Sequence, residues 1–333
     1  MATVRDVAKA AGVSPMTVSN VLNNHPHVRP ATRERVLKAI DDLGYRVNVA
    51  ARNLRAGRTN TIGFAVPEVE SPYFGQLASR IIARAHDAGY RVAIERTGAD
   101  RENELSAITS SRTRMYDGLI LSAVGLGPAD RDLLEIDMPM VILGESMFGA
   151  PVDHIALPNE EGTYAATTHL IERGCRRIAI VQGGDPDRLS VTSLRHAGYR
   201  RAMAEHGMDL HPSLVVERHH LSLEDGRTAA HQLVDAGTGA DGVVCITDTV
   251  AMGVMRGFAD RGLSVPAQVR VVGFDDILEA RYSVPSLTTI DPDHEEVARL
   301  AVELLLARLA DDPHWQPKEH VTGFRVVARE STA

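Results

Sequence analysis

Hydrophobic residues recur every three or four positions along the first 45 residues, which is the spacing of one face of an α-helix. This pattern predicts three short helices. The first starts near Thr3 and stops at Gly12, the second restarts at Ser14-Pro15, and the third runs from about Ala31 to Leu43. Serine caps a helix and proline fits its first turn, so the second helix begins directly after the glycine turn. Two short helices joined in this way predict a helix-turn-helix, and the third closes a small core with Val36, Leu37, Ile40 and Leu43.

The second predicted helix is the one that a helix-turn-helix places in the major groove of DNA, by its N-terminal end. The Asn20 amide can hydrogen-bond adenine, and Met16 and Pro15 can touch a thymine methyl group. Thr17 or Ser19 can bind phosphate. The alternative is that Met16 packs within the protein and Asn20 faces water. The candidate DNA-binding residues of this segment are Ser14, Pro15, Met16, Thr17, Ser19 and Asn20.

From Thr61 onward the pattern changes to short apolar runs that alternate with helical segments. Near-continuous runs of Val, Ile and Leu between helices indicate parallel strands buried on both faces of a sheet. Two sets of such units predict an α/β protein with two doubly wound lobes, in which ligands bind in the crevice at the carboxyl ends of the strands. The predicted strands are Thr61–Val66, Tyr90–Ile94, Asp117–Leu121, Met140–Leu143, Arg177–Val181, Gly242–Ile246, Val269–Phe274 and Gly323–Ala328.

The distribution of charge separates the same two parts of the chain. Residues 1–60 carry ten basic and four acidic side chains, whereas the whole chain of 333 residues has a net charge of −8. A basic segment on an acidic body favours a polyanion as the partner of that segment, although chance clustering on a solvated surface would look the same. Only two cysteines occur, and neither a signal peptide nor an 18-residue apolar run is found. We expect a soluble, cytoplasmic protein with no membrane partner.

A segment of helical composition, residues 48–55, follows the third predicted helix. Asn48 can cap it, but about eight residues are too few to hold a helix in water, which suggests folding on binding. Leu54 is the kind of apolar side chain that inserts between base steps in a minor groove. The alternative is an ordinary linker whose Leu54 packs on the next domain.

Several longer motifs, taken together, are specific enough to indicate a protein family. They are Thr3–Asn23, the Val28–Arg33 turn, Leu43-Gly-Tyr45, Asn53-Leu54, Arg195–Tyr199, Thr247-Asp248, Ala251-Met-Gly253, Gly273–Asp275 and Pro285–Ile290. Together these motifs resemble the lactose/galactose repressor (LacI/GalR) family of transcriptional regulators, over nearly the whole chain.

The resemblance implies a division of the chain into a headpiece and a core. The headpiece, residues 1–58, would be a helix-turn-helix domain with a hinge helix at about 48–55. In the family this hinge orders in the minor groove of operator DNA, which gives Leu54 the role of kinking the DNA, with Asn48 and Ala51 beside it. Residues 59–333 would be a periplasmic-binding-protein-like core for effector binding and dimerisation. In the family the chain crosses between the two lobes of the core. By resemblance, residues of about 60–158 and 289–319 would form the lobe that follows the headpiece (the near lobe), and residues of about 159–288 and 320–333 would form the other (the far lobe).

Polar and aromatic side chains follow several predicted strands, where the crevice is expected. An aromatic wall with an arginine and an aspartate suits a small hydroxylated ligand. Alternatively, Arg195 forms a salt bridge and Asp275 caps a turn. By resemblance, Leu221 replaces a residue that is often aromatic, Glu145 replaces a frequent aspartate and is not expected as a contact, and Asp248 also fits a helix cap. The candidate effector-binding residues are Ser71, Tyr73, Phe74, Arg195, Leu221, Thr247 and Asp275.

Signals of catalysis or metal binding are weak. His294-Glu-Glu lacks the second histidine of a zinc helix, and Gly183-Gly184 lacks the spacing of a phosphate loop. His219 and His220 would face opposite ways in a strand, so a solvated pair is favoured over a metal site. We expect no enzyme activity, no cofactor and no metal. A doubly wound fold can carry an enzyme, but no catalytic constellation supports that alternative.

The resemblance implies a regulator, expected to be a repressor, that binds a palindromic operator on double-stranded DNA as a homodimer. A small-molecule effector would bind between the lobes, with a sugar or sugar acid as the first expectation and a purine-like ring as the second. The remaining alternative is a small-molecule binding protein whose headpiece no longer binds DNA. A dimer is expected over a tetramer because the sequence ends at Ala333, soon after the last predicted strand.

Overall fold

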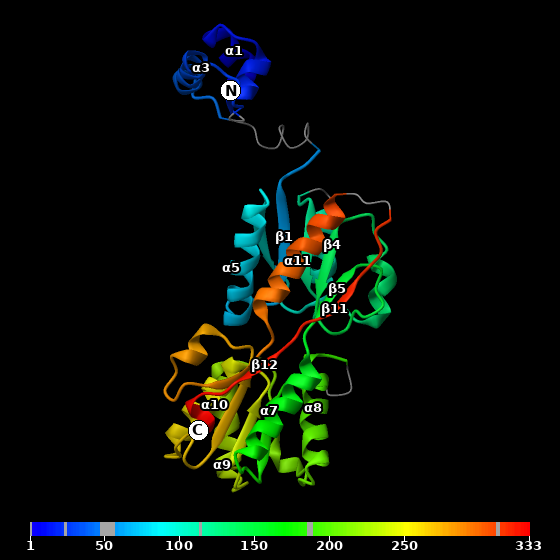
Figure 1. Ribbon diagram of the computed structural model, residues 1–333, viewed down its shortest axis with the longest axis vertical. Helices are drawn as coiled ribbons and strands as arrows, with labels where there is room; N and C mark the ends of the chain where they lie inside the picture. Colours follow the sequence, from blue (N-terminus) through cyan, green and yellow to red (C-terminus); the bar gives the residue numbers. More distant parts are fainter. Residues whose placement is uncertain (1, 23–24, 47–56, 113–114, 185–188, 311–313) are drawn as a thin grey trace. The chain divides into compact units, whose positions relative to one another are not determined.

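The computed structural model describes residues 2–22, 25–46, 57–112, 115–184, 189–310 and 314–333. It divides into two compact units, Met1–Thr59 and Asn60–Ala333 (Figure 1). The first unit corresponds to the headpiece and the second to the core.

Three helices form the described part of the headpiece: α1 (Val4–Ala11), α2 (Pro15–Leu22) and α3 (Pro30–Asp42). Thr3 and Asp6 form a capping box at the start of α1, and Gly12 ends that helix in the left-handed conformation, at φ 62°. Only glycine adopts this conformation without strain, so it fixes the tight turn into α2. The predicted helix-turn-helix with a third helix is confirmed.

The predicted core of the headpiece is wrong at two positions. Leu37 and Leu43 are 50% and 41% exposed, whereas Val36 and Ala39 are buried and Ile40 is half-buried. Leu37 lies about 100° around the helix from Val36, away from the other two helices. Leu43 follows the end of α3, so it no longer continues the buried face.

The near lobe of the core contains a six-stranded parallel sheet in the order β11-β5-β4-β3-β1-β2. Helices α5 (Pro72–Asp87) and α11 (His294–Leu309) pack on one face, and α6 (Arg101–Arg112) with the 3-10 helix η1 (Pro128–Leu134) covers the other. The strands are β1 (Thr61–Val66), β2 (Arg91–Arg96), β3 (Gly118–Ser122), β4 (Met140–Leu143), β5 (Asp153–Ala156) and β11 (Glu319–Val321).

The far lobe repeats this plan, with the order β12-β10-β9-β8-β6-β7 and an antiparallel edge strand, β12. Helices α7 (Asn159–Glu172) and α8 (Val191–Glu205) pack on one face, and α9 (Leu223–Asp235) with α10 (Asp248–Asp260) packs on the other. The strands are β6 (Ile178–Gln182), β7 (Val215–Glu217), β8 (Gly242–Cys245), β9 (Arg270–Phe274), β10 (Thr288–Asp291) and β12 (Arg325–Val327). The 3-10 helices are η2 (Pro212–Leu214), η3 (Leu278–Arg281) and η4 (Glu330–Thr332). Two doubly wound parallel-sheet lobes are therefore confirmed.

Three connections cross between the lobes, and two of them differ from expectation. Strand β10 pairs with β9 of the far lobe, so the expected start of the returning near-lobe segment at 289 moves beyond Asp291. Strand β11 pairs with β5 of the near lobe, so the expected start of the final far-lobe segment at 320 moves beyond Val321. The Oγ1 of Thr322 donates to the Pro292 carbonyl at 3.0 Å, which joins these two crossing segments side by side.

Close packing of α7 against α8 sets the position of the residues between the lobes. A Cβ atom on Gly198 of α8 would come within 2.1 Å of the Glu160 carbonyl oxygen on α7. No side chain fits such an approach, so glycine allows the two backbones to touch. This contact brings the start of α7 next to the middle of α8.

Cys175 and Cys245 are free and buried. No helix among the described residues is long and apolar enough to cross a membrane.

Candidate functional sites

The N-terminal end of α2 is built as a surface for contact. The Ser14 hydroxyl caps the helix by accepting from the Thr17 backbone N–H at 3.2 Å, and Val18 is fully buried in the headpiece core. Met16 is 70% exposed, so the alternative that it packs within the headpiece is wrong. Pro15 is also exposed, whereas Thr17, Ser19 and Asn20 are half-buried along the same helix.

The hinge lies outside the described residues. The predicted hinge helix and its candidate DNA contacts Asn48, Ala51 and Leu54 fall within residues 47–56. Their roles therefore remain predictions of the sequence.

Arg195 is the centre of a buried cluster between the two lobes. Its side chain is 3% exposed, and its Nε donates to the Asn159 Oδ1 at 2.7 Å. Its Nη1 donates to the Ile246 carbonyl and lies 3.7 Å from the Asp275 Oδ1. The guanidinium also stacks over the Phe274 ring, 3.5 Å from its centroid. Arg195 is thus held by residues that follow β5, β8 and β9, at the carboxyl ends of parallel strands.

Two carboxyl groups share this cluster, and burial raises the pKa of each. The pKa of Glu145 rises to about 7 because its side chain is removed from water, although hydrogen bonds from Leu157 and Asn159 oppose the shift. The Leu157 N–H donates to Glu145 at 3.2 Å. Burial also raises the pKa of Asp275 to about 7, against the attraction of Arg195. Below pH 7 these groups tend to hold a proton that they can donate in a hydrogen bond, and above pH 7 they are carboxylates that only accept.

Two further residues belong to this cluster: Asn159, which the sequence analysis did not consider, and Glu145, which it did not expect as a contact. Both are buried, at 2% and 4% exposure, respectively. A positional signal existed for Glu145, which lies two residues after the predicted strand β4, but not for Asn159, which lies three residues after β5, a strand that the sequence analysis did not predict.

Tyr73 and Phe74, the two aromatic residues of the predicted wall, pack against each other. Tyr73 packs against Phe74 edge to face, with ring centroids 4.9 Å apart, and its own ring lies 5.0 Å from that of His294. Burial, with the nearby Asp275 charge, raises the pKa of Tyr73. Tyr73 contacts the hydrophobic cores of both lobes, so it lies at their junction. Ser71 precedes α5 and is half-buried.

Three further candidates have clear structural roles. The Thr247 hydroxyl caps α10 by accepting from the Val250 N–H at 3.2 Å. The Asp248 carboxylate accepts from the Thr289 Oγ1 at 2.6 Å and from the Ile277 N–H at 3.0 Å, so it holds the loop after β9 and is not the cap. Leu221 has a φ of 53° and packs on the hydrophobic cores of the far lobe. Thr247 and Leu221 are nevertheless half-buried and remain candidates.

Among the described residues, no group of three or more His, Cys, Asp and Glu side chains could hold a metal ion. His219 and His220 lie in a bend, and both are exposed.

Comparisons with known proteins cover both units of the chain. A model of the bacterial regulatory proteins of the lacI family matches residues 3–48, and a model of the periplasmic binding protein-like domain matches residues 167–332. The HTH-type transcriptional repressor PurR of Vibrio atlanticus (strain LGP32) is 33% identical over 316 residues, which is 94% of each chain.

Solved structures extend the similarity to the arrangement of the fold. The lac repressor dimer bound to operator and the anti-inducer ONPF gives a TM-score of 0.83 at 29% identity, with 99% of each chain covered. The transcriptional regulator CelR in complex with cellobiose gives a TM-score of 0.72 at 28% identity, with 99% of this chain and 100% of that chain covered. The chain therefore belongs to the lacI family of bacterial regulatory proteins and is a DNA-binding transcriptional regulator with a small-molecule effector.

Proposed function

We propose that this regulator is a cytoplasmic, non-enzymatic repressor that binds a palindromic operator as a dimer and is controlled by a small polyhydroxylated effector. The buried cluster of Arg195, Asp275, Glu145 and Tyr73 between the lobes is the observation that carries the proposal. Its groups follow strands of both sheets, so one ligand can contact both lobes. A ligand that bridges two lobes changes their separation, and this is how it would act on the headpiece.

The chemistry of the cluster favours a sugar. Paired hydroxyl groups can donate to the carboxylates of Asp275 and Glu145 and accept from the Arg195 guanidinium, while a sugar face stacks on Tyr73 and Phe74. The complex of the similar CelR with cellobiose supports this class of ligand. The proposed effector residues are Ser71, Tyr73, Phe74, Arg195, Leu221, Thr247 and Asp275, to which we add Glu145 and Asn159.

Selection of genomic fragments by the purified protein tests the proposal directly. Fragments would be selected at near-physiological salt, with and without a panel of sugars, sugar acids and purines. We expect enrichment of one near-palindrome, which one compound of the panel abolishes or creates. If no sequence is enriched under any condition, the headpiece is not a working DNA reader and the chain is a small-molecule binding protein.

Asn20, half-buried in the second half of α2, provides a test of base reading. The Asn20→Ala variant is expected to lose about 1–3 kcal/mol of operator binding and to relax the base preference at one position of each half-site. The measurement is binding to a set of single-base operator variants at fixed salt. Gln316→Ala removes an exposed amide from the core and serves as the control. A uniform loss of affinity across all operator variants would contradict a base contact by Asn20.

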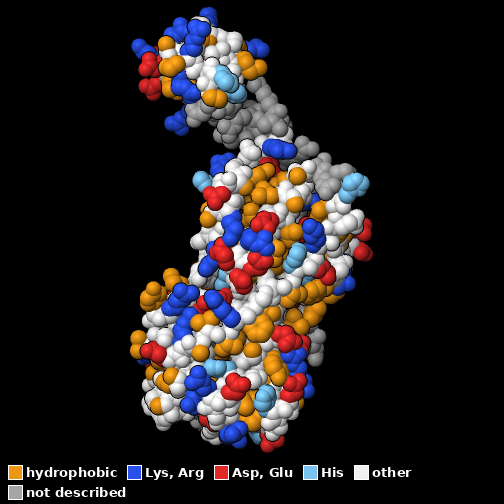
Figure 2. Space-filling view, viewed as in Figure 1, with side chains coloured by type: hydrophobic (Ala, Val, Ile, Leu, Met, Phe, Trp, Pro, Cys, Tyr) orange, Lys and Arg blue, Asp and Glu red, His pale blue; other side chains and the backbone are white. Residues whose placement is uncertain are grey.

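An exposed apolar patch on the far lobe fits the dimer contact. Leu278, Tyr282 and Val284 are 53%, 77% and 96% exposed, and Figure 2 shows hydrophobic side chains gathered on the surface at η3. Contiguous apolar surface of this kind marks protein interfaces. We expect Tyr282→Asp to shift the protein from dimer towards monomer at micromolar concentration in light scattering. Leu223→Asp, a change at an exposed leucine on α9, is the control; a dimer that persists unchanged in Tyr282→Asp would place the interface elsewhere.

A further inference from the structure

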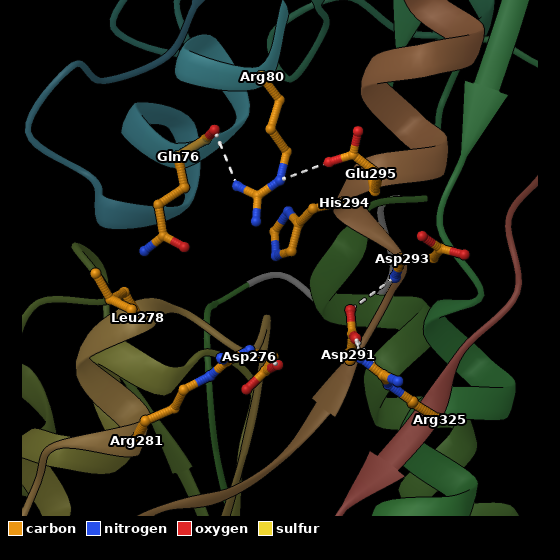
Figure 3. Close-up of a pocket in the computed structure, with 10 residues that line it drawn as sticks. All are labelled: Gln76, Arg80, Asp276, Leu278, Arg281, Asp291, Asp293, His294, Glu295 and Arg325. Carbon is orange, nitrogen blue, oxygen red and sulfur yellow. Dashed lines mark hydrogen bonds and ion pairs between the residues drawn. The ribbon is translucent and has the colours of Figure 1, made fainter.

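A cavity lies next to the effector cluster, and His294, which contacts Tyr73 and Asp275 of that cluster, is one of its lining residues. The cavity encloses about 230 Å³. Its walls come from both lobes: α5 and the start of α11 on one side, and η3, β10, β12 and the loop after β9 on the other (Figure 3). Sites for drug-sized ligands measure about 300–1,000 Å³, so this cavity suits an ion or a small metabolite.

The two arginines that face each other across this cavity have incomplete partners. Arg80 from the near lobe lies 3.4 Å from Glu295, but Arg84 binds the same carboxylate more closely. Arg281 from the far lobe lies 3.5 Å from Asp276, a carboxylate that Arg329 binds more closely. Contacts of 3.4–3.5 Å are at the limit of hydrogen bonding, so both guanidinium groups retain donor capacity.

The orientation of Arg80 supports this reading. Its Nη1 donates to the Gln76 carbonyl at 3.1 Å, while its Nη2 has no partner within the described part of the chain. Figure 3 shows this free end of the guanidinium pointing into the space above Asp276 and Arg281. The Arg281 side chain is 56% exposed and reaches the cavity from below.

The remaining carboxylates of the cavity already have partners. Arg325 binds Asp291 through two nitrogens, at 2.7 and 2.9 Å. Asp293 caps α11 by accepting from the Glu296 N–H at 3.1 Å. Arg325 therefore offsets the charge of Asp291, whereas Asp293 keeps its charge. The four lining carboxylates, Asp276, Asp291, Asp293 and Glu295, are still outnumbered by the five arginines that pair with them, Arg80, Arg84, Arg281, Arg325 and Arg329.

His294 adds a buried acceptor to the wall of the cavity. It is 4% exposed, and its Nε2 donates to the Asp275 carbonyl. Its Nδ1 is buried and has no hydrogen-bond partner among the described residues. Burial lowers the pKa of His294, which favours the neutral ring, and with the proton on Nε2 the Nδ1 atom can only accept. A buried acceptor without a donor costs about 1–3 kcal/mol, and a ligand hydroxyl would remove that cost.

We propose that this cavity binds a phosphate group, with Arg80 and Arg281 donating to its oxygens from opposite lobes and the Nδ1 of His294 accepting from its hydroxyl. Inorganic phosphate and a small phosphate ester share this chemistry.

The phosphate site is coupled to the effector cluster through one side chain. The His294 ring contacts Tyr73, and its Nε2 binds the carbonyl of Asp275. A phosphate group that draws the two arginines together also sets the separation of the lobes. This coupling rests on the proposed function, and it must be reciprocal: phosphate and effector change each other's affinity by the same factor.

Calorimetric titration of the full-length protein tests the site without DNA or effector. The probes are inorganic phosphate, sulfate and glucose 6-phosphate, with glucose as the uncharged control. We expect saturable binding of phosphate or of the ester, and at least tenfold weaker binding in each of Arg80→Gln and Arg281→Gln. Arg261→Gln removes a surface arginine that pairs with Asp235 and should bind as the wild type does.

Sulfate carries the same charge as hydrogen phosphate but no hydroxyl, so it should bind more weakly; equal affinity would overturn the role of His294. Absence of any saturable binding, or equal binding by Arg80→Gln, Arg281→Gln and the wild type, would overturn the site. Either result leaves the proposed function standing, because operator selection and effector response are measured separately. The ratio of the affinities for inorganic phosphate and for glucose 6-phosphate shows whether the site binds the free ion or a phosphate ester.

Discussion

Replacing Arg195 with methionine is expected to abolish the response to the effector and to destabilise the core by about 3–5 kcal/mol at pH 8, while operator binding remains. Arg195→Met keeps an unbranched apolar side chain but removes the guanidinium charge that faces Asp275 from α8. Leaving one member of a buried ion pair without its partner costs about 3–5 kcal/mol. The free energy of unfolding of the core in urea and the effector dependence of operator binding measure the two effects.

A control variant on the same helix distinguishes the loss of a buried ion pair from the loss of an exposed one. Arg201 pairs with Glu160 and Glu161 at 2.7 Å, but its side chain is 33% exposed. Exposed ion pairs contribute about 0–1 kcal/mol, so Arg201→Met should change stability little and leave the effector response intact. The pH gives a second check: Asp275 without its arginine takes up a proton more readily, so the loss in Arg195→Met should shrink at pH 6. A variant that still responds to the effector would remove Arg195 from the proposed site.

The elements that the sequence predicts best are those with long, regular hydrophobic patterns. Strands β1 and β4 match the predicted ranges, and the three headpiece helices differ by about one residue. Their pattern is clear because each buries a continuous apolar face. Strands β5, β7, β10 and β11 were not predicted, since they are three or four residues long and include polar side chains such as Asp153 and His154. Missing β10 and β11 also explains the misplaced lobe crossovers.

The sequence predicts the part of the site that depends on strongly patterned strands, and not the rest. Residues that follow a strong strand could be placed at the crevice, and Arg195 and Asp275 do lie 3.7 Å apart there. The sequence could not show that Glu145 joins them, because its burial depends on how the near lobe meets the far lobe. The double role of Arg195, a salt bridge together with a candidate ligand contact, likewise appears only when the partners are in place.

Changing Glu145 to glutamine is expected to raise the stability of the core at alkaline pH. Burial raises the pKa of Glu145 from its ordinary value of 4.5 to about 7 in the folded protein, so the folded state holds the proton more tightly than the unfolded state does. Between pH 4.5 and 7 the unfolded carboxyl loses its proton first, and stability falls as pH rises. A shift of this size corresponds to about 3 kcal/mol, because one pKa unit is about 1.4 kcal/mol. Glu145→Gln does not titrate, so its stability relative to the wild type should increase by about 3 kcal/mol between pH 4.5 and pH 8.

The comparison with the wild type isolates the effect of Glu145 on the pH dependence of stability, because the buried carboxyl of Asp275 titrates in both proteins. Glu135→Gln removes an exposed carboxyl from the same lobe and should show no such change. A stability difference that stays constant across this pH range would mean that Glu145 is solvated in solution. If the difference grows as expected, the wild type keeps a destabilising charge between its lobes. Hydroxyl groups of a bound ligand would then stabilise that charge, so effector binding near pH 7 should release protons into the buffer.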